Sequence, residues 1–179
     1  MGEQKDHRSV LLLVAAFSRY PAALAWGREQ LESRWGPVRL TSELFPFTWS
    51  NYYEKTMGTE LVKMFWAFES LIDPVELPSI KRTTNQLEQE VTRVVDALET
   101  RPLNLDPGYL TEAKLVLATT KDRDHRLYLA EGIFGEVTLH YHRGAWKGRE
   151  WTYPDYLQAG YHQFFDQCRQ YLRNCYHRR

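Results

Sequence analysis

The chain has 179 residues, with 23 basic and 23 acidic side chains and a formal net charge of zero. This length suits one domain with its own hydrophobic core, and the zero charge disfavours a nucleic-acid-binding domain, which usually carries an excess of lysine and arginine. Hydrophobic residues make up 43% of the chain, more than a disordered protein carries. No apolar run approaches the roughly 20 residues of a membrane span.

The first half of the chain predicts a strand, a helix and two further strands. Residues 10–17 are continuously apolar, as in a strand covered on both faces. Pro21 suits the first turn of a helix that ends at Gly36-Pro37. Residues 38–45 and 62–68 alternate with a period of two, which predicts two strands.

From Asp73 the pattern becomes helical. Asp73-Pro74 begins a helix whose apolar face continues to about Glu99. Residues 102–105 are extended, and Asp106-Pro107-Gly108-Tyr109 matches a type II turn. The element order β-α-β-β-α-β predicts an α+β protein with a ferredoxin-like antiparallel sheet and two helices on one face.

The last third is expected to extend this core with a β-hairpin and a long C-terminal helix. Residues 111–118 fit either a short helix or a strand, and the sequence leaves that choice open. Residues 125–130 and 134–142 predict a hairpin, and Pro154 opens a long helix with an apolar stripe.

Two cysteines lie on that stripe. Cys168 and Cys175 are seven residues apart, so on a helix they are about 10 Å apart along the axis and do not pair. The lack of a disulfide framework favours a reducing compartment, and we expect a cytoplasmic protein. We expect one domain over residues 1–179, with the ferredoxin-like core at 9–106 and the hairpin and last helix at 107–179.

Polar residues between Asn104 and Arg126 predict an anion site, because hydroxyls beside lysine, histidine and arginine supply donors and positive charge together. Asp106 and His125 are candidates for acid–base chemistry there. The alternative is a turn, a helix cap and a solvated loop. The candidate ligand-binding residues of this segment are Tyr109, Thr111, Lys114, Thr119, Thr120, Lys121 and Arg126.

The predicted hairpin carries a second polar group. Glu136, Thr138, His140 and His142 share one side of a strand by alternation. Two histidines at this spacing can both reach a metal ion, but no third ligand accompanies them, so we expect an exposed polar face and no metal site. Glu136 joins Asp106 and His125 as a catalytic candidate.

Two aromatic segments, residues 45–53 and 151–156, form the third candidate. Tyr53, Trp151 and Tyr153 suit stacking on a base or a sugar, although aromatic residues more often fill cores. In the ferredoxin-like arrangement the 47–53 connection and the predicted Asp106 turn lie at opposite ends of the sheet. They form one site only if the C-terminal third folds back to join them.

Several stretches together resemble one known family, catalogued as bacterial domain of unknown function four-four-one-six. The resemblance runs from the first strand to the last helix and implies a bacterial, cytosolic protein without implying a reaction. The stretches that carry it are residues 45–47, 52–53, 57–58, 68–74, 104–111, 114–122, 125–126, 136–139 and 151–156.

The sequence favours binding of an anionic small molecule, either a nucleotide or a phosphorylated metabolite, with Lys114, Lys121, His125 and Arg126 engaging its charge. The alternative is a non-catalytic interaction or dimerisation module that uses exposed aromatics and a sheet edge. Nucleic-acid and membrane partners are disfavoured. The sequence names no cofactor and does not decide whether the protein is an enzyme.

Overall fold

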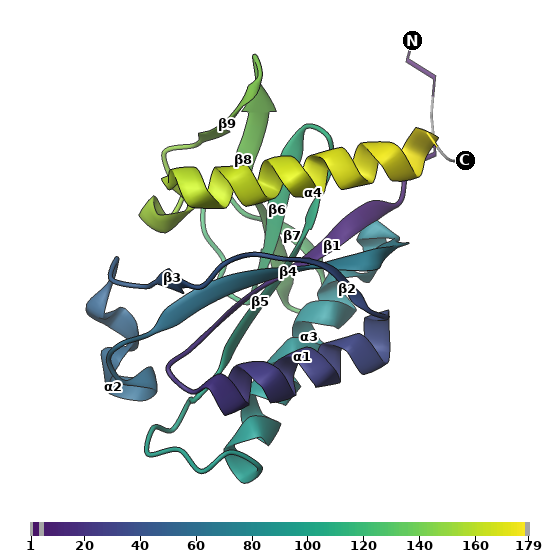
Figure 1. Cartoon of the computed structure of the whole chain (residues 1–179). Coiled ribbons are helices and arrows are strands. Elements are labelled where there is room, and N and C mark those ends of the chain that lie inside the picture. The colour runs from purple at the N-terminus through teal and green to yellow at the C-terminus, as the bar shows by residue number, and fades with distance from the viewer. Residues whose placement is uncertain (1, 4–5, 178–179) are drawn as a thin grey trace.

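The computed structural model describes residues 2–3 and 6–177, and it is an α+β fold built on one large antiparallel sheet (Figure 1). The strands are β1 (Val10–Ser18), β2 (Val38–Thr41), β3 (Phe45–Pro46), β4 (Val62–Ile72), β5 (Asn104–Leu110), β6 (Lys114–Thr119), β7 (Leu127–Ala130), β8 (Ile133–His142) and β9 (Ala145–Gly148). The α-helices are α1 (Pro21–Trp35), α2 (Glu54–Met57), α3 (Leu77–Glu90) and α4 (Ala159–His177). Short 3₁₀ turns are η1 (Asn51–Tyr53), η2 (Pro74–Glu76), η3 (Val91–Arg93) and η4 (Pro154–Leu157).

The strand order is β2-β4-β1-β5-β6-β8-β7, with β3 paired to β4 and β9 paired to β8. The predicted α+β class, the β7–β8 hairpin and the long last helix are confirmed. The sheet has nine strands in the described residues, more than the four-stranded core with one hairpin that the sequence predicted.

Strand β1 runs through the middle of the sheet, and all nine of its residues are buried. Alternate residues such as Leu12 and Val14 pack with α1 and α3, whereas Leu11 and Leu13 pack with α4. Figure 1 shows α4 on one face of the sheet and α1 and α3 on the other. This two-sided burial explains the continuous apolar run, because both faces of the strand leave water.

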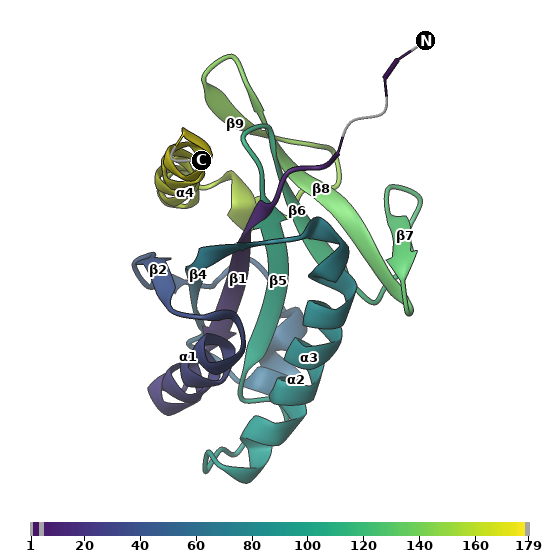
Figure 2. The same cartoon turned by 90° about the vertical axis from the view of Figure 1, so that its right-hand side faces the viewer.

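Strands β5 and β6 separate along part of their length. The two pair only from Gly108↔Leu117 to Leu110↔Leu115, while the earlier residues of β5 pair with β1 alone. Figure 2 shows β8 leaning away from β5 toward the β7 edge. A fork therefore opens between β5 and β6 on the side of Asn104.

The predicted type II turn at 106–109 is wrong, because these residues lie inside β5. Pro107 precedes the β5–β6 ladder, where a residue without a backbone N–H suits a strand that lacks a neighbour. Gly108 is needed for close approach of the two strands, since a Cβ there would lie 2.3 Å from the Val116 carbonyl oxygen.

Two predicted helix boundaries also differ. The helix expected to reach Glu99 ends at Glu90 and continues only as η3. Val91 and Val95 still pack against the core, but Val94 and Leu98 are 60% and 96% exposed, so the core covers only part of the apolar stripe there. The last helix begins at Ala159 rather than Pro154, since extended Gln158 separates it from η4. Residues 114–119, left open between helix and strand, form β6.

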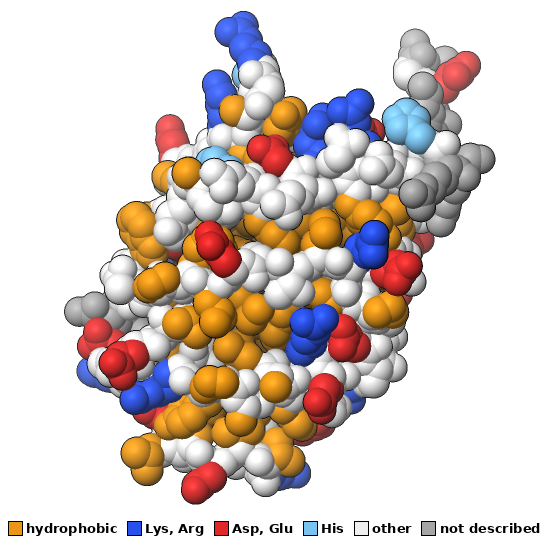
Figure 3. Space-filling model, in the orientation of Figure 1, with side chains coloured by type: hydrophobic (Ala, Val, Ile, Leu, Met, Phe, Trp, Pro, Cys, Tyr) orange, Lys and Arg blue, Asp and Glu red, His pale blue; other side chains and the backbone are white. Residues whose placement is uncertain are grey.

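Both cysteines lie on α4 and are free: Cys168 is buried on its inner face and Cys175 is partly exposed. Within residues 2–3 and 6–177, no helix has the length and apolar character needed to cross a membrane. On the face seen in Figure 3, hydrophobic side chains gather between α4 and α1, with charges of both signs scattered among them. That mixture matches the zero net charge of the chain.

Candidate functional site

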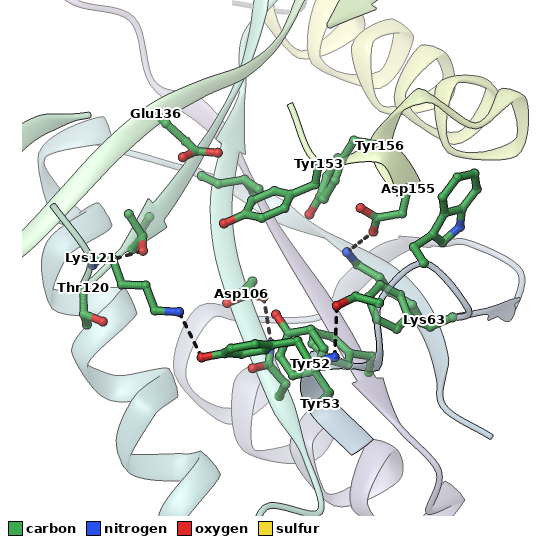
Figure 4. A pocket seen from close by; sticks show the side chains of 18 of the residues that line it. Tyr52, Tyr53, Lys63, Asp106, Thr120, Lys121, Glu136, Tyr153, Asp155 and Tyr156 are labelled. Carbon is green, nitrogen blue, oxygen red and sulfur yellow. Dashed lines mark hydrogen bonds and ion pairs between the residues drawn. The ribbon is translucent and has the colours of Figure 1, made fainter. Parts of the chain in front are cut away.

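A cavity of about 500 Å³ occupies the fork between β5 and β6 (Figure 4). This volume is typical of small-molecule sites. The described residues that line it are Phe17, Phe47, Trp49, Ser50, Tyr52, Tyr53, Lys63, Lys81, Asn85, Arg101, Asn104, Asp106, Leu117, Ala118, Thr119, Thr120, Lys121, Glu136, Tyr153, Pro154, Asp155 and Tyr156.

The cavity joins three segments that are far apart in the sequence. The 47–53 connection contributes Tyr53, strand β5 contributes Asp106, and the 153–156 segment between β9 and α4 contributes Tyr153. The last segment folds back over the fork, which is the condition under which the sequence allowed one joint site. The expected placement of the 47–53 connection and Asp106 at opposite ends of the sheet is wrong. Phe17 pairs with Asn104 and Ser18 pairs with Val62, so the start of β5 and the 47–53 connection lie at the same end.

One wall of the cavity is built around the Asp106 carboxylate. Lys81 from α3 donates to Asp106 Oδ1 at 3.0 Å and to the Leu105 carbonyl at 3.1 Å, and Asn104 donates to Asp106 Oδ2 at 2.7 Å. Burial alone would raise the pKa of Asp106, but the Lys81 and Lys63 ammonium groups and these hydrogen bonds lower it. Asp106 is therefore an ionised acceptor that holds Lys81, not a proton donor.

The opposite wall is built around Glu136 on β8. Arg126 Nε donates to Glu136 Oε2 at 2.7 Å, and His125 Nε2 lies 3.3 Å from the same oxygen. Arg126 also donates to the Tyr153 hydroxyl at 3.1 Å, and the His125 ring stacks on Trp151 with centroids 5.0 Å apart. These contacts join the segment after β6 to the 151–156 segment and so connect two walls of the cavity.

The polar face of the hairpin, expected to be exposed, is exposed at His142 and half-buried at His140, but it is buried at Glu136 and Thr138. Glu136 and Thr138 have almost no exposed surface, because Thr152 donates to the Thr138 carbonyl at 2.6 Å and covers the strand. Further along β8, the rings of His140 and His142 lie 6.3 Å apart. In the described part of the chain, no three histidine, cysteine or acidic side chains converge as a metal site.

The floor of the cavity contains a buried ion pair. Lys63 Nζ lies 2.6 Å from Asp155 Oδ2, and each side chain is 5% exposed. The Tyr156 ring centroid is 4.4 Å from the same Nζ. The Tyr156 hydroxyl is buried and has no hydrogen-bond partner among the described residues, and Figure 4 shows it directed into the cavity. Burial raises the pKa of Tyr156, so this hydroxyl stays protonated and available to donate.

The mouth of the cavity is aromatic and carries one exposed lysine. Lys121 Nζ lies 5.0 Å from the Tyr52 ring centroid and 3.4 Å from the Tyr52 hydroxyl. Tyr52 is 67% exposed, and Trp49, which also lines the cavity, is exposed as well. Among the residues that the structure describes, no carboxylate lies within ion-pair distance of Lys121. Its positive charge therefore faces the opening of the cavity.

The residues predicted from the sequence separate into three groups. Those that line the cavity are Tyr53, Asp106, Thr119, Thr120, Lys121, Glu136 and Tyr153. Those that bind lining residues or stack behind the wall are His125, Arg126 and Trp151.

The third group lies outside the cavity. Tyr109 packs into the hydrophobic core, and Thr111 caps the turn before β6 by accepting from the Lys114 backbone N–H. Lys114 is exposed at the start of β6, whereas Thr119 at the other end of the strand reaches the cavity.

Sequence reasoning missed the buried lysines. Lys63 alternates with Phe65 and Ala67, a charge on an apolar strand face, and this spacing is a usable signal. Lys81 lies four residues after Leu77 and three before Thr84, on the buried face of α3. The interpretation of 151–156 as an aromatic cluster also left out Asp155, the partner of Lys63.

A family model described as domain of unknown function (DUF4416) matches residues 8–171. The match covers most of the chain, so the chain belongs to this family, and the resemblance found in the sequence is confirmed. The searches of curated proteins and of solved structures returned no match.

Proposed function

We propose that this DUF4416 protein binds a small anionic molecule, a nucleotide or a phosphorylated metabolite, in the cavity between β5 and β6. The observation that carries the proposal is the Tyr156 hydroxyl, which is 2% exposed as a residue, unpartnered among the described residues and directed into the cavity. A buried polar group without a partner costs about 1–3 kcal/mol. A ligand that accepts this hydrogen bond removes that cost.

The charge at the mouth favours an anionic ligand. Lys121 carries a positive charge that no described carboxylate neutralises, and the hydroxyls of Thr119 and Thr120 line the wall next to it. A phosphate group needs this combination of a cation and short donors. Arg126 supports the site indirectly, because its guanidinium is engaged by Glu136 and Tyr153.

The aromatic side chains at the mouth suit the planar or sugar part of such a ligand. The rings of Tyr52 and Tyr53 meet edge to face at 5.1 Å, and both line the cavity. An exposed ring at the mouth of a cavity stacks on a base at a gain of about 1–3 kcal/mol.

Thermal-shift measurements test this function. Inorganic phosphate, adenosine, and adenine and guanine nucleotides are added to the wild type, and we expect at least one phosphorylated compound to raise the melting temperature. Lys121→Ala should abolish that shift, and Tyr156→Phe should weaken binding about tenfold, the equivalent of one hydrogen bond. Lys114→Ala is the matched control, because it removes a lysine from the far end of β6 and should keep the shift.

The proposal fails if no phosphorylated compound shifts the wild type. It also fails if Lys121→Ala and Lys114→Ala reduce the shift equally, because a general loss of positive charge would then explain the result.

A second candidate function is self-association through strand β7. This strand lies at the end of the sheet, and its side chains Leu127, Tyr128 and Leu129 are exposed. An unpaired strand edge with apolar side chains is a template for pairing with another strand. Light scattering over a range of concentrations tests this, and a monomer at every concentration contradicts it.

We also propose a ferredoxin-like core made of β1, β2, β4 and β5 with α1 and α3. The order β5-β1-β4-β2, antiparallel throughout, and the packing of both helices on one side of β1 support this description. We also propose a cytoplasmic location, because a chain with only two cysteines, both on α4, has no disulfide framework of the kind found in oxidising compartments.

A further inference from the structure

The environment of Lys63 at the floor of the cavity is not explained by the binding of an anion at the mouth. It projects from β4 to the floor of the cavity, and its ammonium contacts the Asp155 carboxylate at 2.6 Å. Aromatic ring centroids lie 4.4–5.7 Å from Nζ, and the rings belong to Phe17, Phe47, Phe65, Tyr156 and Tyr161. A buried ion pair is often no more stabilising than apolar residues of the same volume, so stability is a weak reason for a lysine here.

We propose that Lys63 is a nucleophile that condenses with an aldehyde or ketone group of a molecule in the cavity and forms a protonated Schiff base. The inference goes beyond anion binding and does not require a phosphate group on that molecule. It assigns a chemical step to a buried amine that lies at the floor of a cavity beside a proton acceptor and a hydroxyl donor, the groups that this reaction needs.

The groups around Lys63 accept and return the proton that the condensation requires. Asp155 Oδ2 takes one proton from the ammonium, which frees the nitrogen lone pair to attack the carbonyl carbon. A C–N bond forms, the C=O π electrons move to oxygen, and a proton passes from nitrogen to that oxygen to give the carbinolamine. Asp155 then returns its proton to the hydroxyl, water leaves, and the nitrogen lone pair forms the C=N bond. The products are an iminium cation, one water molecule and the original carboxylate.

Two features favour this outcome at Lys63. The iminium is a cation in the position of the former ammonium, so the same ring faces and the Asp155 carboxylate stabilise it. The Tyr156 hydroxyl has no partner among the described residues and lines the same floor. It is therefore free to donate to the carbonyl oxygen as negative charge develops there.

The second buried lysine of the cavity has a different environment. Lys81 donates to both the Leu105 carbonyl and the Asp106 carboxylate. An iminium nitrogen carries only one N–H, so a Schiff base at Lys81 would leave one of these two acceptors without a donor, which costs free energy in a buried site. Among the described residues Lys63 donates to one acceptor, Asp155, which the single N–H of an iminium can still satisfy and which can itself take the proton. We therefore expect the reaction at Lys63 and not at Lys81.

Reductive trapping tests the proposal on the intact protein. The wild type is incubated with pyruvate, or with glyoxylate, in the presence of sodium cyanoborohydride, which reduces the iminium to a stable secondary amine. We expect one adduct with the mass of the carboxylic acid probe less one oxygen atom, and peptide mapping should locate it at Lys63. Because exposed lysines react slowly and without selectivity, modification of Lys63 should exceed that of every other lysine.

Three variants sharpen the result. Lys63→Arg keeps a positive charge beside Asp155 but is not a nucleophile under these conditions, so the adduct should disappear. Lys147→Arg removes an exposed lysine on β9 and should leave the adduct unchanged. Asp155→Asn cannot accept the proton, and the trapping rate should fall about a hundredfold, a typical contribution of general acid–base catalysis.

Several outcomes overturn the proposal. Lys63 could remain unmodified, or modification could be spread evenly over the exposed lysines. The proposal is also overturned if Lys63→Arg forms the adduct to the same extent as the wild type. The wild-type peptide map decides the question even if a variant fails to fold. Since the probes lack phosphate, a negative result here leaves the thermal-shift test of anion binding intact, and a negative thermal-shift result leaves this test intact.

Discussion

Removing one member of the Lys63–Asp155 pair should destabilise the fold strongly and unequally. The two charged groups lie 2.6 Å apart with 5% of each side chain exposed, so either one left alone is a charge out of water. Breaking a buried pair typically costs about 3–5 kcal/mol. Lys63→Met keeps most of the side-chain volume and leaves the Asp155 carboxylate unpaired, so we expect a loss in that range.

Asp155→Asn should cost less than Lys63→Met. The ammonium that remains still faces five aromatic rings, and cation–π contacts in a desolvated site return about 1–2 kcal/mol. We therefore expect a loss of about 2–3 kcal/mol for Asp155→Asn. The double variant carries no charge at either of these two positions, so its loss should be smaller than the sum of the two single losses by about 2 kcal/mol or more.

Urea denaturation of the wild type, both single variants and the double variant measures these differences. The free energy of unfolding is extrapolated to zero urea, and equal slopes establish that the variants unfold in the same two-state manner. Additive losses would refute the reasoning, because they would mean that the two charges do not interact. Equal losses for the two single variants would refute the stabilising role of the rings.

Three further predictions concern the walls of the cavity. Gly108→Ala should lower the free energy of unfolding, measured by urea denaturation, by about 3 kcal/mol. The reason is that the alanine Cβ would lie 2.3 Å from the backbone oxygen of Val116. A loss below about 1 kcal/mol would contradict the close packing of β5 and β6. The pKa of Asp106 is lowered from 3.8 in the folded state, so the stability that its carboxylate contributes should be complete above pH 3.8 and disappear as the pH falls through the folded pKa. Asp106→Asn should therefore flatten the acidic part of the profile of unfolding free energy against pH. An unchanged profile in that range would contradict the prediction. Arg126→Ala should cost about 3 kcal/mol because it strips the buried Glu136 of its guanidinium partner, and Arg126→Ala with Glu136→Gln should recover part of that loss in the same assay.

The sequence predicted correctly those elements whose pattern of apolar residues shows which of their faces are buried. The continuous apolar run of β1 requires cover on both faces, and the structure supplies it from α1, α3 and α4. The apolar stripe after Asp73 predicted a helix correctly but its end incorrectly. Helical spacing continues to Leu98, whereas the sheet that covers the stripe does not, and spacing along one segment carries no information about where its neighbour stops.

The candidate site was predicted in part for a related reason. Thr119 ends strand β6 and Thr120 and Lys121 follow it, so this group of polar side chains is recognisable from the local sequence. Lys63 and Asp155 are 92 positions apart in the chain. The role of either residue can be recognised only once the contact between them is known. A lysine in an alternating strand suggests a solvated face until a second layer, here η4 and α4, is known to cover it.

The misinterpreted segment at 106–108 explains why a cavity exists at this place. Proline and glycine in succession favour a turn when only local geometry is considered. In the sheet, Gly108 permits contact with β6 on one side, and Pro107, which cannot donate a ladder hydrogen bond, marks the position where that contact stops. Beyond it β5 follows β1 while β6 follows β8. The space between the diverging strands has no backbone partner to fill it, so side chains line it: Asp106 and Asn104 from one strand, Thr119 from the other. The same two residues that end the strand pairing therefore create the polar cavity in which Lys63 is buried.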